Sequence, residues 1–276
     1  MRRERVADDI YVFTSDLYAQ VTAGAIITTA GAILIDTMVF PEESKAIRQF
    51  IQQRLNTEVR YIINTHYHAD HTYGTCFFPQ ATVIAHSLCY DYLNTRGRES
   101  LAQAQQASRT FHEVSVKLPN LVFDSGTLEI RLGGKTLEMW PSPGHSKDSI
   151  VVLVKEDRVL FAADTLMPAP YFVDGSFEDF VQSLERLRGN NYENVIQGHG
   201  EVVLRGEIES KIESDLEYLQ SVKKYVEIAL TKPDPAAYLN TIDIEKCGKS
   251  RIALNGEVQQ LHIGNLRALL AQYQTA

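Results

Sequence analysis

Short apolar stretches separated by glycine or polar residues fill most of the chain. They are rich in β-branched and aromatic residues, which favour extended structure, and most are too short for a helix. We therefore expect strands at residues 10–14, 24–29, 32–36, 59–64, 82–85, 127–132, 136–139, 149–154, 158–162 and 195–196.

A second pattern, with apolar residues about four positions apart, predicts helices between these strands. It is clearest after Pro41, where Ile47, Ile51 and Leu55 fall on one helical face. Helices are expected at residues 41–55, 88–111, 177–187, 207–230 and 258–273. Strand-rich runs interleaved with helices in two similar halves favour two sheets packed together, with helices covering them.

Length and composition restrict the classes of protein that fit this pattern. The 276 residues, 44% hydrophobic and 22% charged, suit one large domain or one domain with a small appendage. Such a chain buries a sizeable core without disulfides or a structural metal, so any metal is free to serve chemistry. The net charge of −8 argues against a nucleic-acid-binding surface as the main function.

The cysteines and the N-terminus bear on location. Cys76, Cys89 and Cys247 are widely separated and form no CxxC pair, so neither a disulfide framework nor a thiolate zinc site is expected. The basic residues 1–5 are soon followed by two aspartates, where a signal peptide needs an apolar stretch. The most apolar run, residues 24–35, is shorter than the roughly 20 residues of a membrane span. We expect a cytoplasmic protein that does not enter a membrane.

The densest group of chemically active side chains lies at residues 65–71, which read Thr-His-Tyr-His-Ala-Asp-His. Side chains alternate along an extended segment, so His66 and His68 project to the same side and can grip one ion. Asp70 and His71 lie further on and can reach an adjacent ion. Imidazole and carboxylate together suit zinc, with iron or manganese as alternatives. A solvated polar loop is the competing interpretation, but the HxHxDH spacing favours ligation.

Three further residues stand at the ends of predicted strands. His145 follows a glycine in Pro-Gly-His-Ser, where the backbone can turn and present the ring. Asp164 ends the apolar run Phe-Ala-Ala-Asp, where bridging two cations would offset the burial of its charge. His199 lies between two glycines after a short strand. Each signal is weak alone, but in this order they favour a two-metal site.

With these motifs the chain resembles the metallo-β-lactamase superfamily over about residues 10–205. The resemblance implies an α+β fold, a four-layer αβ/βα sandwich with the metals at one edge of the two sheets. The corresponding domain would be residues 1–206, with residues 207–276 as a C-terminal helical extension packed on it. The implied ligands are His66, His68 and His145 for the first metal, Asp70, His71 and His199 for the second, and Asp164 as the bridge.

Such a centre predicts a dinuclear hydrolase with two Zn²⁺ ions. Two ions about 3.5–4 Å apart would share a water and lower its pKa towards ~7, and the resulting hydroxide would attack an ester, thioester or lactone carbonyl. Asp70 is the expected catalytic residue, because a free carboxylate oxygen can orient the water and accept its proton. The aspartate at position 164 resembles the glyoxalase II and lactonase branches rather than true β-lactamases.

Other functions compete with this one. β-Lactam hydrolysis and phosphodiester hydrolysis fit the metals, but no export signal or RNA-binding arm is evident. A mononuclear iron persulfide dioxygenase shares the run at residues 66–71 but does not need His199. A non-catalytic binding protein is disfavoured because all seven ligands are intact. The expected partner is a small-molecule substrate rather than nucleic acid or a membrane, and a homodimer stays open.

Asp36 and the remaining histidines have other interpretations. Asp36, at a strand end, either supports a ligating histidine from behind or caps a helix or turn. His86 stands between a strand and a helix and is expected to cap or pack. His112 falls in the helical arm, and His262 lies in the last helix with a structural role.

Specificity is expected to lie outside the metal motif. Arg96, Arg98 and Arg109 of the helical arm could meet an acidic substrate or form a solvated face. The C-terminal helices either cap the pocket or form a dimer surface. Aromatic neighbours of the motifs could line an apolar pocket or belong to the core; they are Tyr67, Tyr73, Tyr171 and Phe172.

Overall fold

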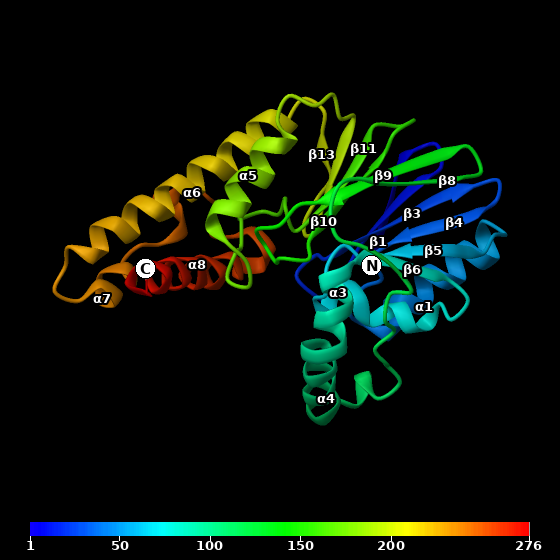
Figure 1. Ribbon diagram of the computed structural model, residues 1–276, viewed down its shortest axis with the longest axis horizontal. Coiled ribbons are helices and arrows are strands. Elements are labelled where there is room, and N and C mark those ends of the chain that lie inside the picture. Colours follow the sequence, from blue (N-terminus) through cyan, green and yellow to red (C-terminus); the bar gives the residue numbers. More distant parts are fainter. Residues whose placement is uncertain (276) are drawn as a thin grey trace.

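Two β-sheets face each other at the centre of the computed structural model, which describes residues 1–275 (Figure 1). The first sheet runs in the order β1 (Arg2–Ala7), β2 (Ile10–Thr14), β3 (Thr22–Thr28), β4 (Gly31–Ile35), β5 (Val59–Ile63), β6 (Thr82–His86) and β7 (Leu121–Phe123). The second runs in the order β13 (Val203–Leu204), β12 (Asn194–Gln197), β11 (Val159–Ala163), β10 (Ile150–Val154), β9 (Lys135–Pro141) and β8 (Leu128–Leu132).

Both sheets are mixed, and their parallel parts position the functional residues. Strands β1 to β4 are antiparallel, whereas β4 to β7 are parallel. In the second sheet β8 to β11 are antiparallel, β12 lies parallel to β11, and β13 is antiparallel to β12. The loops that follow β4, β5, β11 and β12 meet at one edge of the two sheets, because their residues contact one another there.

Alternation of side chains along the strands produces one core between the sheets and a second beneath the helices. Ile33 and Ile35 of β4 face the second sheet, where they join Val152 and Phe161 in one apolar cluster. The intervening Leu34 belongs to a different cluster, on the outer face of the first sheet. This period of two is what a strand covered on both faces requires.

Helices cover the outer face of each sheet. Those on the first sheet's side are α1 (Pro41–Gln49), the π-helical turn η1 (Phe50–Arg54), α2 (Ala69–Thr72), η2 (Tyr73–Phe77), α3 (Ser87–Tyr92), η3 (Leu93–Gly97), α4 (Arg98–Ala107) and η4 (Arg109–Phe111). Those on the second sheet's side are α5 (Phe177–Leu187), α6 (Ile208–Leu230), α7 (Pro235–Leu239), η5 (Ile244–Cys247), η6 (Ala253–Gly256) and α8 (Val258–Thr275). The predicted four-layer sandwich with C-terminal helices is confirmed.

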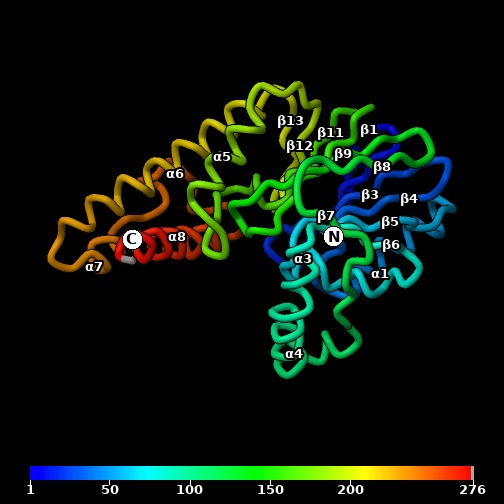
Figure 2. Tube along the Cα trace, viewed as in Figure 1, coloured from blue at the N-terminus to red at the C-terminus, as the bar shows by residue number. Residues whose placement is uncertain are grey.

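The last helices extend away from the sheets yet share their core. Figure 2 shows α6 and α8 side by side, projecting at the opposite end from β4 and β5. One apolar cluster runs from Leu160 of β11 through Phe180 of α5 to Leu219 of α6 and Leu269 of α8. Within residues 1–275 no helix is long and apolar enough to cross a membrane.

The hydrophobic pattern located most of the strands, and the three that it missed share a cause. Strand β1 was not expected, because four of its six residues are exposed and it pairs with β2 through its backbone. Strand β7 has two exposed residues out of three, and β13 is only two residues long. Strands that bury few side chains carry little periodic signal.

Candidate metal centre

Strand β5 delivers the chain into the histidine run at the edge of the sheet. Asp36, which follows β4, accepts hydrogen bonds from the backbone N–H of Thr65 (2.8 Å) and from its hydroxyl (2.7 Å). The same carboxylate faces Nδ1 of His71 at 2.9 Å. Asp36 therefore supports a histidine from behind, which decides between its two interpretations in favour of the first.

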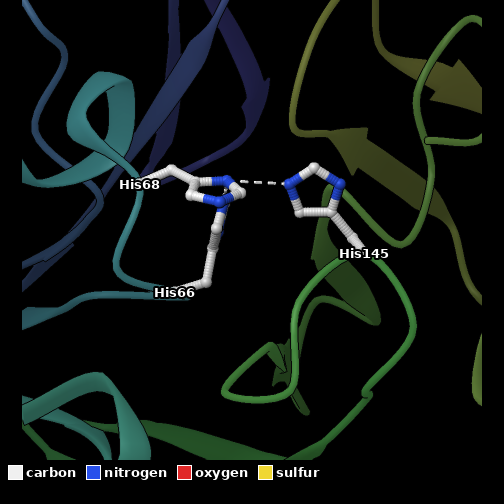
Figure 3. Close-up of side chains that lie close together, drawn as sticks. All are labelled: His66, His68 and His145. Carbon is white, nitrogen blue, oxygen red and sulfur yellow. Dashed lines mark hydrogen bonds between the residues drawn. The ribbon is translucent and has the colours of Figure 1, made fainter. Parts of the chain in front are cut away.

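Three imidazole nitrogens meet at one point beside this segment. Nδ1 of His68 lies 3.1 Å from Nε2 of His66 and 2.9 Å from Nε2 of His145. Figure 3 shows the rings turned toward one another from two different loops. His66 and His145 are buried, and together the three residues form a group that could hold a metal ion.

The other nitrogen of each ring has a partner of its own. Nδ1 of His145 donates to the carbonyl of Tyr171 (2.7 Å), and Nε2 of His68 faces Asp174 (3.2 Å). Nδ1 of His66 lies 3.1 Å from the Thr65 hydroxyl, whose hydrogen is donated to Asp36. Neutral rings that donate outward point three lone pairs at one another. Lone pairs at such distances repel unless a cation lies between them.

A second group lies next to the first. Nε2 of His199 is 3.3 Å from Asp70 Oδ2, and Nε2 of His71 is 3.7 Å from the same oxygen. Nδ1 of His199 donates to the carbonyl of Ala19 (2.9 Å), as Nδ1 of His71 does to Asp36. Each ring is again held on one nitrogen and presents the other. Asp70, His71 and His199 form a second candidate metal group.

Asp164 lies between the two groups. Its Oδ2 is 3.2 Å from Nε2 of His145 and 3.4 Å from Nε2 of His199, while its Oδ1 is 3.3 Å from Nε2 of His71. The position depends on Gly198, because a Cβ there would lie 1.8 Å from the Asp164 carboxylate. The chain entering from β12 thus needs glycine to pass this close to the carboxylate.

Electrostatics differ between the two groups. Burial lowers the pKa of His145 to about 4 and that of His66 well below its usual value, and the charge on His71 lowers the latter further. Both rings are therefore neutral at pH 7 and can offer a lone pair. Burial also opposes a charge on His199, but Asp164 and Asp70 outweigh it and raise its pKa to about 10.

The carboxylates in the second group are stabilised as anions. Burial alone would raise the pKa of Asp164, but the charges of His199 and His71 outweigh it and hold that pKa well below its ordinary value. The pKa of Asp70 is lowered by His71 and His199 in the same way, against its burial. Without a metal ion, protons on His71 and His199 balance the negative charges of Asp70 and Asp164. A metal ion that binds here must therefore displace these protons.

The donor set fits two divalent ions. Nε2 of His71 and Oδ1 of Asp164 are buried and make no hydrogen bond, although each faces other ligand atoms. Such unsatisfied atoms are rare in folded proteins and indicate a missing partner. Five imidazoles and two carboxylates are ligands that zinc, iron and manganese all accept. The structure thus brings together all seven predicted residues in clusters consistent with a dinuclear site.

The other histidines make their hydrogen bonds away from this centre. His86 caps α3, its Nδ1 accepting from the N–H of Leu88 while its Nε2 donates to the carbonyl of Asp124. His112 follows the helical arm, and its Nε2 donates to the carbonyl of Gln105. His262 is fully buried in the C-terminal helices. The cap, arm and structural interpretations match these contacts.

A cavity of about 330 Å³ opens beside the metal centre. Tyr171 lines it, whereas Phe172 is buried in the core and Tyr73 is buried against the helical arm. Its far wall comes from the C-terminal segment through Leu254 and Leu261. The C-terminal helices therefore cap this pocket, one of the two roles expected for them.

Several contributors to the site were missed by the sequence analysis, Asp174 and Glu257 among them. Asp174 stands behind His68 and also accepts from the Tyr67 hydroxyl (2.6 Å) and from Arg96 (3.1 Å). Glu257 lines the cavity next to the helix α8. Neither belongs to a motif, and only proximity in space identifies them.

A side chain of the C-terminal helices is also connected to the metal centre, through the backbone of residues 170–172. Asn265 of α8 accepts from the N–H of Phe172 (3.1 Å) and donates to the carbonyl of Pro170 (2.7 Å). These contacts fix the segment whose Tyr171 carbonyl accepts from His145. A helix near the end of the chain therefore helps to hold a ligand.

Curated relatives match much of the chain at low identity. It is 25% identical over 209 residues to a Beta-lactamase-like protein 2 homolog of Caenorhabditis elegans, covering 73% of this chain. It is 26% identical over 220 residues to a 2,4-dinitroanisole O-demethylase subunit alpha of Nocardioides sp. (77%), and 25% over 181 residues to the thioesterase pkgB of Emericella nidulans (64%). The matches cover 65%, 62% and 45% of these relatives, so the chain spans less than two thirds of each.

Solved structures share the fold. A metallo-beta-lactamase from Pontibacter korlensis matches 79% of this chain and 98% of its own, with a TM-score of 0.64 and 20% identity. The sec-alkylsulfatase Pisa1 from Pseudomonas sp. matches 98% of this chain and 50% of its own, with a TM-score of 0.74 and 16% identity. The family profile described as Metallo-beta-lactamase superfamily matches residues 18–199. The chain therefore belongs to the metallo-beta-lactamase superfamily.

Proposed function

We propose that this protein is a dinuclear metal-dependent hydrolase that cleaves an ester, thioester or lactone. The observation that carries the proposal is the convergence of three imidazole lone pairs beside a carboxylate that also faces the second group of ligands. In this proposal His66, His68 and His145 hold one ion, and Asp70, His71 and His199 hold the other. Asp164 bridges them.

Two divalent ions held there, Zn²⁺ in our proposal, would activate a water as nucleophile and polarise the substrate carbonyl. Asp70 lines the cavity and is held as a carboxylate by His71 and His199. Its Oδ1 is thus available to orient the attacking water and to accept its proton. Tyr18 lines the same cavity with a phenol kept protonated, since the charge of Asp70 raises its pKa to about 12. It can donate a hydrogen bond to substrate.

The choice of carbonyl substrates rests on two further points. An aspartate between the two ligand groups resembles the glyoxalase II and lactonase branches more than true β-lactamases. The thioesterase of Emericella nidulans, 25% identical over 181 residues, also supports a thioester. Metallo-beta-lactamase type 2 of Pseudomonas aeruginosa is equally similar, at 25% over 179 residues, which keeps β-lactams in the test.

The experiment combines metal analysis with turnover. We expect about two equivalents of metal per chain and hydrolysis of thioesters, esters or lactones in preference to β-lactams and phosphodiesters. One bound iron with oxygen uptake on glutathione persulfide would replace this proposal by a dioxygenase. A metal-loaded protein that turns over no member of the panel would contradict the hydrolase.

A further inference from the structure

The cavity beside the metal centre has walls of unlike chemistry. One wall is the ligand cluster itself, including Asp70 and His199. Another part of the wall is apolar, with Met167, Leu254 and Leu261. At about 330 Å³ the space suits a small acyl compound rather than a polymer.

Charge in this cavity is one-sided outside the ligand cluster. Among its described lining residues, Glu257 is the one formally charged side chain beyond the ligands, and no lysine or arginine lines it. The arm's arginines lie elsewhere: Arg96 is paired with Asp174, and Arg98 bonds Asn94. Arg109 lines a separate groove beside Leu17. Outside the ligand cluster, a carboxylate on the substrate would find no cationic side chain here.

Two aromatic residues share the cavity with Glu257. Tyr18 and Tyr171 both line the cavity, and Tyr18 is 46% exposed. The charge of Glu257 is felt at the Tyr18 phenol, whose pKa is raised chiefly by Asp70, then by burial, then by Glu257. Aromatic faces combined with a carboxylate are the chemistry that recognises ammonium groups.

The backbone before α8 is shaped to place this wall. Leu254, Asn255 and Gly256 have φ values of 49°, 56° and 94°, so three consecutive residues are left-handed. Leucine rarely adopts that conformation, and strain of this kind concentrates at functional sites. After this turn, Glu257 and Leu261 lie four residues apart at the start of α8 and both reach the cavity.

We infer that Glu257, with Tyr18 and Tyr171, selects ammonium-bearing ester or thioester substrates over carboxylate-bearing ones. Glu257 is then a specificity residue that touches the end of the substrate remote from the cleaved carbonyl. The inference rests on the proposed hydrolase function. It also disfavours anionic compounds such as glutathione thioesters and most β-lactams as substrates.

Three butyryl thioesters test this charge preference. They share the acyl group and differ in the thiol part, which carries a trimethylammonium group, its uncharged tert-butyl isostere, or a carboxylate. We expect kcat/KM of the metal-loaded protein at low salt to fall in that order. Glu257→Gln should lower the ammonium-to-carboxylate ratio about fivefold, and Glu257→Lys should lower it further. The uncharged thioester should change less than twofold in Glu257→Gln, and higher salt should shrink the discrimination.

The control variant is Glu227→Gln, on the exposed face of α6, where the ratio should stay unchanged. A wild-type preference for the carboxylate, or a ratio unmoved by Glu257→Gln, would overturn the inference. Thioether analogues, with the carbonyl replaced by methylene, report the same preference through their dissociation constants. If no thioester is cleaved, the proposed hydrolase function fails, and these dissociation constants still decide the role of Glu257.

Discussion

Buried histidines occur in two regions of this molecule, at the edge of the sheets and within the C-terminal helices. At the sheet edge His71 and His199 each bond an acceptor through Nδ1 and direct Nε2 at other ligand atoms. In the helices His262 is equally buried, but its Nδ1 meets the Tyr218 hydroxyl at 3.0 Å and its Nε2 donates to the carbonyl of Ile242 at 3.2 Å. Burial is therefore not what marks a ligand. What distinguishes a candidate ligand from a structural histidine is a second ring nitrogen that faces the atoms of other candidate ligands.

The largest expected effect is loss of the central ligands. Asp164→Ala or His68→Ala should abolish metal binding at one or both positions and reduce hydrolysis by at least about 10³-fold, because the activated water depends on both ions. Metal content by elemental analysis and kcat/KM on an uncharged thioester measure this. Full activity with intact metal in both variants would mean that the buried histidines at the sheet edge are not metal ligands and do not differ in role from His262.

For His262 we expect an effect on the free energy of unfolding rather than on metal binding. Burial lowers its pKa to about 4, so the unfolded chain binds a proton more readily than the folded one between that pH and about 6.5. The contribution of neutral His262 is complete above pH 6.5 and is lost as the pH falls to 4, by about 3 kcal/mol. The free energy of unfolding of wild type minus that of His262→Gln should fall by this amount.

The matched control for that measurement is His112→Gln, whose side chain is exposed. This substitution removes an exposed imidazole and so serves as the reference profile for the buried one. A profile for His262→Gln no steeper than that of His112→Gln would mean that the buried ring takes up a proton as readily in the folded chain as in the unfolded one, and the comparison between the two regions would lose its basis.

Close packing at the Asp164 carboxylate gives the next effect. Gly198→Ala places a Cβ into contact with Asp164, and a displacement of about 1 Å at a reacting centre costs about 10²-fold in rate. Gly206→Ala is the control, because a Cβ there meets nothing within 4 Å. Equal activity of the two variants would show that the bridge tolerates movement.

The smallest effect belongs to the carboxylate behind His68. Asp174→Ala removes the acceptor that orients the ring, and such outer partners contribute about 10–100-fold to metal affinity. Titration with a metal-binding dye measures the affinity. Arg96→Gln removes the ion pair but leaves the carboxylate, so it should change the affinity less than threefold.

The sequence predicted which residues gather at the candidate metal centre, because they lie in short motifs at strand ends. The run from His66 to His71 needs only local spacing and one preceding strand to be recognised. Asp174 lies 106 residues from His68, and Glu257 enters from a turn with unusual backbone angles. Contacts of that kind depend on how the sheets and the last helices pack, which periodicity does not encode.

The hydrogen bonds of Asn265 carry a consequence for exchanging parts between relatives. They tie α8 to residues 170–172, and through the Tyr171 carbonyl to the ring of His145. A C-terminal segment grafted from another superfamily member would bring new cavity walls but would break this tie. A working chimaera would have to carry its own version of the 170–172 loop along with the helices.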